Sequence, residues 1–255
     1  MKRIFVVLSF LIGLIPFTLA YGGNLSATFS SVVVDKYIGD VTGVVFYDKP
    51  VVQSGLLLNF ENGFYIDLWN SAPFEGYGNN YGTEVYYGVG WNGPLTALGM
   101  KKIVLDVGIG YSDVPKIMCL GVDDIIYNHI KLSHTVGEFT FSGMYDNYVV
   151  MPGSSYHGGD FLSVGASYEK LFFKDFLGTS LSFAPVYNPA GSYDLEEGLF
   201  LRGSVELSWK LTKHLSMVLP QVNIYEPIKD VKGTSDENVA HASGKTVSIG
   251  FNYQF

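Results

Sequence analysis

The sequence predicts an all-β protein, a transmembrane antiparallel up-and-down β-barrel of about twelve strands. Three observations predict it. The last ten residues alternate strictly between apolar and polar side chains. Short alternating segments of the same kind recur along the chain after residue 20, where no helical period of 3.6 residues persists. Hydrophobic residues make up 47% of the chain, yet no apolar run after Ala20 reaches the roughly 18 residues that a membrane-spanning helix needs.

The N-terminus predicts a secretory signal peptide over residues 1–20. Two basic residues, Lys2 and Arg3, precede an apolar run that leads to a small-residue cleavage site at Ala20. A membrane-spanning helix is the competing interpretation, but the run is short and Pro16 interrupts it. We therefore expect an exported protein in which one barrel domain occupies residues 21–255.

The final strand reaches the last residue of the chain. Its apolar face carries Val247, Ile249, Phe251, Tyr253 and Phe255, and its other face carries Thr246, Ser248, Gly250, Asn252 and Gln254. A soluble all-β domain is the alternative, but such a domain has no need of a terminal aromatic residue on its last strand. In this ending the chain resembles bacterial outer-membrane β-barrels. The resemblance implies an outer-membrane location, contact with outer-membrane lipid, and recognition of Phe255 by the barrel assembly machinery as its assembly signal. Acidic outer loops on a chain with a net charge of −8 would in addition suit divalent cations and lipopolysaccharide.

The alternating segments predict twelve strands joined by short and long connections in turn. The strands are expected at 24–36, 50–60, 63–71, 83–92, 101–112, 123–132, 137–150, 159–170, 176–188, 196–210, 214–225 and 244–255. Short turns are expected at 61–62, 133–136 and 211–213, with slightly longer ones at 93–100 and 171–175, and polar loops at 37–49, 72–82, 113–122, 151–158, 189–195 and 226–243. This alternation is typical of a barrel whose two ends both lie in the periplasm.

The strongest strands also indicate which face meets lipid. In 101–112 the apolar residues Ile103 to Tyr111 alternate with Asp106 and two glycines. A charge facing lipid costs about 2–4 kcal/mol near the bilayer midplane, so the charged face is assigned to the lumen. Four aromatic residues near strand ends on the other face predict an interfacial girdle, with ordinary core packing as the alternative: Trp91, Trp209, Tyr253 and Phe255. Pro220, in the middle of a strand, predicts a bulge or an early strand end.

The same register predicts a charged set of pore-lining residues, with His129 beside it. The set comprises Asp67, Glu84, Asp106, Lys131, Asp146, Glu169, Arg202, Glu206 and Lys210. Because acids outnumber bases in it, a water-filled lumen would favour cations. The alternative is a network of ion pairs that plugs a small barrel.

The sequence gives little support for catalysis, metal binding, an internal disulfide or nucleic-acid binding. His157 has Ser154, Ser155 and Ser163 nearby, but no hydrolase motif is present, so we expect no enzyme and no cofactor. The acidic pairs at 123–124 and 236–237 lack the spacing of a calcium loop, so no metal site is expected. Cys119 is the only cysteine and cannot form an internal disulfide. The net charge of −8 argues against nucleic acid as a partner, because phosphate binding needs a basic face.

Several short segments invite a narrower comparison. Asp35-Lys36-Tyr37, Pro50-Val51-Val52-Gln53, Asn62-Gly63-Phe64-Tyr65, Leu68-Trp69-Asn70-Ser71 and Thr83-Glu84-Val85 resemble the opening of the TorF-like family of outer-membrane porins. That family often has an Arg-Gly pair where this chain reads Tyr37-Ile38-Gly39-Asp40. The resemblance implies a pore-like barrel whose solute is not defined.

The sequence thus predicts an outer-membrane channel, a porin, for passive diffusion of small polar or cationic solutes. A closed barrel that presents loops 37–49, 72–82 and 226–243 in an adhesive or structural role is the alternative. A barrel enzyme is a third hypothesis. A monomer and an oligomer fit the sequence equally well.

Overall fold

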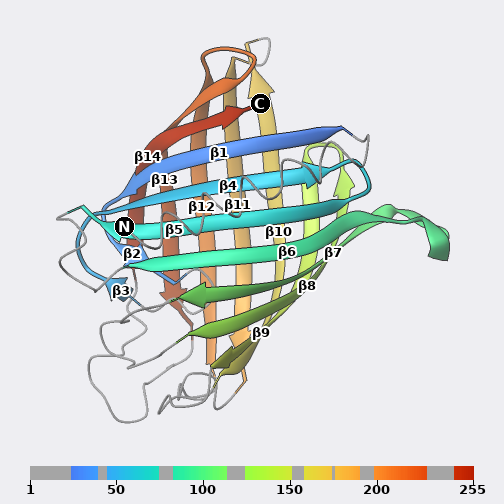
Figure 1. Cartoon of the computed structure of the whole chain (residues 1–255), viewed down its shortest axis with the longest axis horizontal. Coiled ribbons are helices and arrows are strands. Elements are labelled where there is room, and N and C mark those ends of the chain that lie inside the picture. The colour runs from blue at the N-terminus through green and yellow to red at the C-terminus, as the bar shows by residue number, and fades with distance from the viewer. Residues whose placement is uncertain are drawn as a thin grey trace.

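The computed structural model describes residues 24–39, 45–74, 83–113, 124–150, 158–173, 176–189, 198–228 and 244–255. In these residues twelve strands form one closed antiparallel barrel, which confirms the predicted fold class (Figure 1). The barrel strands are β1 (Leu25–Val34), β4 (Val51–Phe60), β5 (Phe64–Pro73), β6 (Glu84–Leu95), β7 (Met100–Asp113), β8 (Ile125–Val136), β9 (Phe139–Val150), β10 (Gly159–Phe172), β11 (Leu177–Asn188), β12 (Gly198–Lys210), β13 (Leu215–Pro227) and β14 (Gly244–Gln254).

Each barrel strand pairs with its neighbour in chain order, and the first strand closes the barrel against the last. Val33 of β1 lies opposite Ile249 of β14 on one side and opposite Val52 of β4 on the other. A short sheet of β2 (Tyr37–Ile38) and β3 (Val45–Tyr47) lies in the connection between β1 and β4. Within the described residues, no helix has the length and apolar character needed to cross a membrane.

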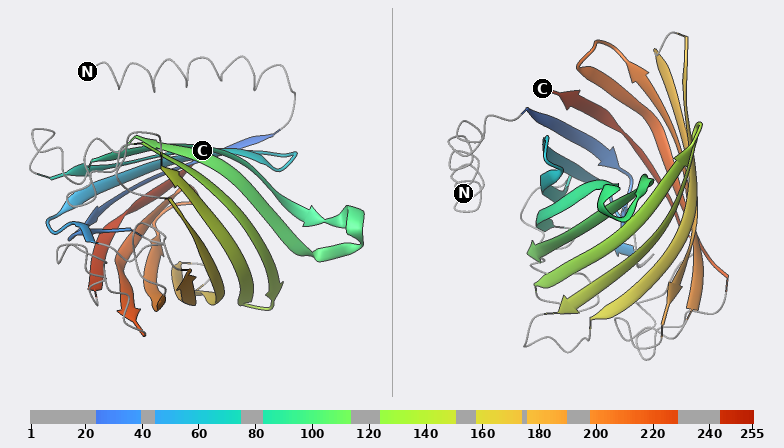
Figure 2. Two further views of the ribbon diagram at one scale, coloured as in Figure 1. Left: turned by 90° about the horizontal axis from the view of Figure 1, so that it is seen from below. Right: turned by 90° about the vertical axis from the view of Figure 1, so that its right-hand side faces the viewer.

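Short and long connections alternate as predicted, and they define two rims. The turn rim carries the connections 61–63, 96–99, 137–138, 173–176 and 211–214, and the loop rim carries 35–50, 74–83, 114–124, 151–158, 189–197 and 228–243. The hairpin of β6 and β7, with its single helical turn η1 (Thr96–Leu98), projects beyond the turn rim (Figure 2).

The turn predicted at 133–136 is wrong, because those residues continue β8. The chain reverses at Gly137 and Glu138 instead, where Gly137 has a φ of +62°. A two-residue hairpin needs positive φ, which glycine adopts without strain. Thr135 and Thr140 flank the turn, and their hydroxyls hydrogen-bond at 2.9 Å.

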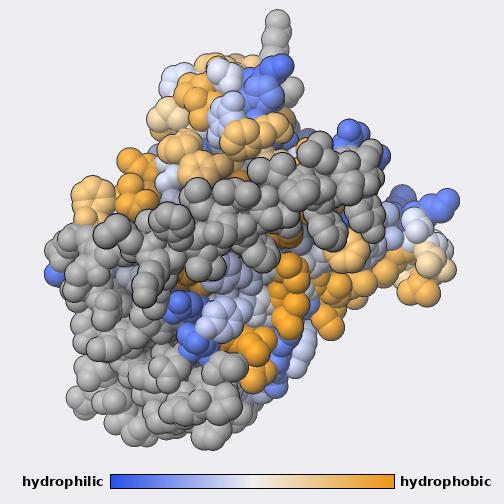
Figure 3. Space-filling view, viewed as in Figure 1, coloured by the Kyte–Doolittle hydropathy of each residue, from blue (hydrophilic) through white to orange (hydrophobic). Residues whose placement is uncertain are grey.

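The outward face of the barrel is apolar. Val89, Ile109, Ile130, Phe141, Val164 and Phe183 lie on strands around the barrel and are each between 47% and 63% exposed. Apolar side chains are also visible along the barrel surface to the right of the view in Figure 3. A soluble protein seldom leaves so continuous an apolar surface in water, so this surface calls for an apolar surrounding.

The aromatic residues predicted at strand ends do lie on the outer face of the barrel, at the turn rim. Trp209 packs edge-to-face on Phe176 with ring centroids 5.2 Å apart, and Tyr253 packs on Phe255 at 4.8 Å. Trp91 donates a hydrogen bond from Nε1 to the carbonyl of Asn62 at 3.0 Å. The polar N–H of Trp91 is therefore satisfied at the turn rim, and the apolar part of its ring can lie on the apolar outer face of the barrel.

The bulge predicted at Pro220 is confirmed. The register of β13 shifts against β12 between Val205 and Leu207, and against β14 between Val218 and Gln221. Proline has no N–H to donate to a ladder, so the strand accommodates it where pairing is interrupted.

Candidate functional site

The register places the nine predicted charged residues on the inner face, because cross-strand partners point to the same side of a sheet. Asp106 of β7 lies opposite Lys131 of β8. Glu169 and Glu206 both lie opposite Ser180 of β11, which puts their Cα atoms roughly 10 Å apart on one row. Whether these side chains line an open pore stays a prediction.

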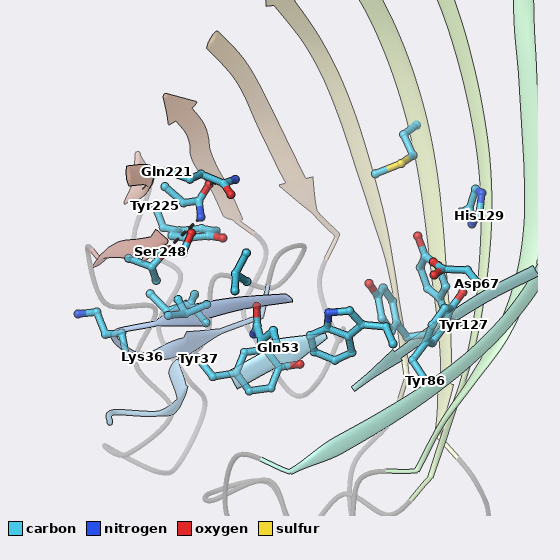
Figure 4. Close-up of a pocket in the computed structure, with 18 of the residues that line it drawn as sticks. Lys36, Tyr37, Gln53, Asp67, Tyr86, Tyr127, His129, Gln221, Tyr225 and Ser248 are labelled. Atoms are coloured by element: carbon cyan, nitrogen blue, oxygen red, sulfur yellow. Dashed lines mark hydrogen bonds between the residues drawn. The ribbon is translucent and has the colours of Figure 1, made fainter. Parts of the chain in front are cut away.

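A central cavity of about 560 Å³ occupies the barrel interior toward the loop rim (Figure 4). Of the predicted charged set, Asp67, Asp106 and Lys131 border it, together with Lys36 and His129. A second cavity of about 310 Å³ lies at the turn rim and is bordered by Lys210, along with polar and basic residues of the 211–214 turn.

Three side chains from three strands form a hydrogen-bonded cluster in the wall of the central cavity. The hydroxyl of Tyr65 on β5 lies 3.0 Å from Asp106 Oδ1 and 3.2 Å from His129 Nε2. His129 Nε2 itself lies 3.1 Å from the same Asp106 oxygen. The carboxylate of Asp106 is therefore engaged by two neighbours within the wall.

Two tyrosine rings, those of Tyr65 and Tyr86, lie over glycines on the inner face of β6 and β7. We call this set of glycines the glycine floor: Gly88, Gly90, Gly108 and Gly110. A Cβ at Gly90 would come within 2.3 Å of Tyr65 Cζ, and one at Gly110 within 2.2 Å of Tyr86 Cε2. A Cβ at Gly88 would come within 2.4 Å of Tyr86 Oη, and one at Gly108 within 2.5 Å of His129 Cε1 and 2.6 Å of Tyr65 Oη. Only glycine leaves room for rings to cross these strands, so the floor fixes Tyr65 and Tyr86 in place.

A side chain introduced at Gly110 should therefore destabilise the barrel. We expect Gly110→Val to lower the free energy of unfolding by about 1–3 kcal/mol, because the ring of Tyr86 must leave its place. The thermal unfolding midpoint in detergent micelles measures this effect. Gly143→Ala is the matched control, since the nearest atom to a Cβ there is 3.9 Å away. Equal midpoints for the two variants would contradict the proposed fit.

Asp146 departs from the predicted pore-lining set. It faces inward, but it is completely buried, and it accepts a hydrogen bond of 2.5 Å from Tyr127. Aromatic rings gather around it: Tyr127 and Tyr148 have centroids 5.0 Å apart, and Tyr148 packs edge-to-face on Phe161. The carboxylate therefore belongs to the wall and cannot touch a solute in this arrangement.

The described residues of the connection between β1 and β4, 35–39 and 45–50, include a cluster that packs against the inner wall. Tyr37 and Tyr47, at 8% and 3% exposure, pack with Val34 and Val51, and the ring of Tyr37 lies 5.9 Å from that of Trp69. We call residues 36–48 the inward hairpin. Of the loop that the adhesive alternative placed at 37–49, Tyr37, Ile38 and Tyr47 are buried, whereas Asp48 and Lys49 are exposed.

Glu84 anchors the inward hairpin to the wall. Its carboxylate accepts a hydrogen bond from the hydroxyl of Tyr37 and another, of 2.7 Å, from the hydroxyl of Ser112. Tyr37 also borders the central cavity. The hairpin thus crosses from β1 toward β6 and narrows the lumen, and Glu84 holds it there.

Sequence reasoning missed the inward tyrosines of this site. Tyr65, Tyr86, Tyr127 and Tyr148 all face the interior, where the sequence analysis considered only charged residues. The signal that could have found them is the set of glycines at inward positions of two neighbouring strands. Several earlier predictions lie outside the described residues: the signal peptide at 1–20, Cys119, Ser154, Ser155, His157, Asp123 and the pair at 236–237.

Ser163, the described member of the suggested hydrolase group, lies in β10 opposite Met144 and Val186. Among the described residues, no group of three or more His, Cys, Asp or Glu side chains is arranged to hold a metal ion.

No protein-family model matches this chain, so membership of the TorF-like family is not confirmed. No curated protein matches it either. Solved structures do: the NanC porin superposes with a TM-score of 0.56 at 7% identity, over 89% of this chain and 98% of that one. The fold is similar to that of the NanC porin. The KdgM porin gives a TM-score of 0.53 at 11% identity, over 90% of this chain and 99% of that one. A KdgM structure in complex with disordered oligogalacturonate matches equally well, at 12% identity.

Proposed function

We propose that this chain is an outer-membrane channel for the passive diffusion of small polar or cationic solutes. The observation that carries the proposal is a closed barrel, apolar outside, whose inner wall bears charged residues and encloses cavities. The porin fold shared with NanC and KdgM supports it. Export through the segment 1–20 and residence in a Gram-negative outer membrane belong to the same proposal.

The inner wall favours cations over anions. Six of the nine predicted pore-lining residues are acids, and of these Glu169 and Glu206 lie on one row of the β10–β12 wall. Fixed negative charge in a narrow tube with low-dielectric walls concentrates counter-ions inside it. NanC and KdgM share only the fold, at 7–12% identity. The solute of this chain is therefore inferred from the residues of its own inner wall.

The test is the conductance of the refolded protein in a planar bilayer, with a salt gradient to give the reversal potential. Discrete current steps with a preference for K⁺ over Cl⁻ are expected. A folded barrel that conducts no ions would favour a structural or adhesive role instead.

The proposed assembly signal gives a separate prediction. Phe255 is 69% exposed and touches Tyr253, so its removal should change the stability of the folded barrel little. We expect Phe255→Ala to lower the amount of folded barrel in the outer membrane severalfold, measured as the heat-modifiable fraction on gels. Refolding into detergent should be unchanged, and Gln254→Ala, on the other face of the strand, serves as control. Equal membrane levels for the two variants would contradict a signalling role for Phe255.

A further inference from the structure

The wall of the central cavity holds one carboxylate for which no side-chain hydrogen bond is found among the described residues. Asp67 of β5 is half-buried and borders the cavity, and the described residue that acts on its charge is His129, which forms no hydrogen bond with it. Asp106, by contrast, is engaged by Tyr65 and His129 and lies opposite Lys131. The negative charge of Asp67 is therefore available to something in the cavity.

Aromatic rings flank Asp67 on the same face. Tyr65 precedes it by two residues on β5, so both side chains point inward. Asp67 lies opposite Gly88, which lies opposite Gly110, and the ring of Tyr86 lies over both glycines. Figure 4 shows Asp67 gathered with Tyr86 and Tyr127 on one side of the cavity. The Tyr86 and Tyr127 rings have centroids 6.3 Å apart.

This arrangement suits a positively charged organic group. The faces of aromatic rings attract cations, and the attraction grows where water is excluded. Because the glycine floor already fixes Tyr65 and Tyr86, a ligand does not have to order them, which favours binding. Of the two lysines that border the cavity, Lys131 stands opposite Asp106, and Lys36 lies on the far side (Figure 4).

We propose that Asp67, Tyr65 and Tyr86 form a binding site for organic cations, solutes that carry a substituted ammonium or a similar group. The proposal rests on the proposed function, since it names the class of solute that would bind transiently while it passes through the lumen. The cavity of about 560 Å³ falls within the range of small-molecule sites, about 300–1,000 Å³. A bare divalent metal ion fits less well, because such ions take several oxygen ligands and one free carboxylate supplies too few.

Trp69 offers a direct readout, because it borders the same cavity. The chain has three tryptophans, and a Trp91→Phe, Trp209→Phe variant leaves Trp69 as the single tryptophan, whose fluorescence is excited selectively over that of tyrosine. We would titrate this refolded variant in detergent with N-methylpyridinium, a cationic quencher, and with acrylamide, a neutral one. Saturable quenching is expected from the cation and linear quenching from acrylamide.

Substitutions then test the site. Asp67→Asn should raise the half-saturating N-methylpyridinium concentration about tenfold, equivalent to the loss of one charged contact. Tyr86→Leu should raise it severalfold. Asp160→Asn is the matched control, since it removes an acid from the outer face, where Asp160 accepts a hydrogen bond from Tyr145, and it should leave the titration unchanged. Heat-modifiability of each variant on gels shows that the barrel has folded.

The site would be overturned by quenching by the cation that does not saturate, or by the same half-saturation in Asp67→Asn. Displacement of N-methylpyridinium by glucose as readily as by tetramethylammonium would also overturn it, in favour of a saccharide site. Binding is measured without a membrane, so the two proposals can fail separately. A barrel that binds the cation but never conducts would refute the channel alone, and one that conducts without saturable binding would refute the site alone.

Discussion

Removal of the inward hairpin is expected to raise the single-channel conductance severalfold. The hairpin packs against the inner wall and borders the central cavity, so it occupies cross-section that ions would otherwise use. The deletion is structurally simple, because Val34 and Val51 lie opposite each other at the ends of β1 and β4. Two residues such as Asn-Gly can join strands that meet in this way, so residues 35–50 can be replaced by a short turn.

A milder variant tests the hydrogen bond between Tyr37 and Glu84 separately from the volume that the hairpin occupies. Tyr37→Phe combined with Glu84→Gln keeps every ring and most of the volume, but it removes the charged acceptor that holds the hairpin. We expect recordings that switch between a low and a high conductance level. Tyr145→Phe is the matched control, because it breaks a tyrosine–aspartate bond of 2.6 Å to Asp160 on the outer face. If the deletion conducts no more than the parent chain, the hairpin is not the narrowest part of the lumen.

The strands could be predicted from the sequence because both faces of a barrel wall impose a requirement. One face meets an apolar surrounding and the other a polar interior, so side chains alternate along every strand. In β7, Ile109 is outside and 51% exposed while its neighbour Gly110 is buried inside. The turn after β8 was misplaced because residues 133–136 are polar enough to suit a loop. The backbone freedom of Gly137 was the better indicator of where the chain turns.

The site could be predicted only in part. The inward orientation of the charged residues could be predicted, because apolar and polar side chains alternate along each strand and this alternation is visible in the sequence. The fit of Tyr65 over Gly90 and Gly108 does not, since it depends on how three strands are aligned. The burial of Asp146 and the inward course of the hairpin likewise depend on contacts between distant segments, such as the bond between Tyr37 and Glu84.

The charges of the wall should decide which ions pass. We expect Asp106→Asn combined with Glu206→Gln to abolish most of the preference for K⁺ over Cl⁻. The first substitution leaves Lys131 without the acid that lies opposite it, and the second removes one of the two acids that share a row with Ser180. The reversal potential under a KCl gradient measures the change, which should move toward zero.

The control for this prediction must remove the same amount of negative charge as the lumen variant, but from residues outside the lumen. Asp160→Asn with Glu138→Gln does so: Asp160 bonds to Tyr145 on the outer face, and Glu138 lies in the turn beside Lys170, 3.8 Å away. Exposed charges of this kind are screened by salt within about 10 Å, so the reversal potential should stay at its original value. An unchanged reversal potential in the lumen variant would mean that the inward acids are neutralised within the wall. Selectivity would then have to come from the width of the lumen.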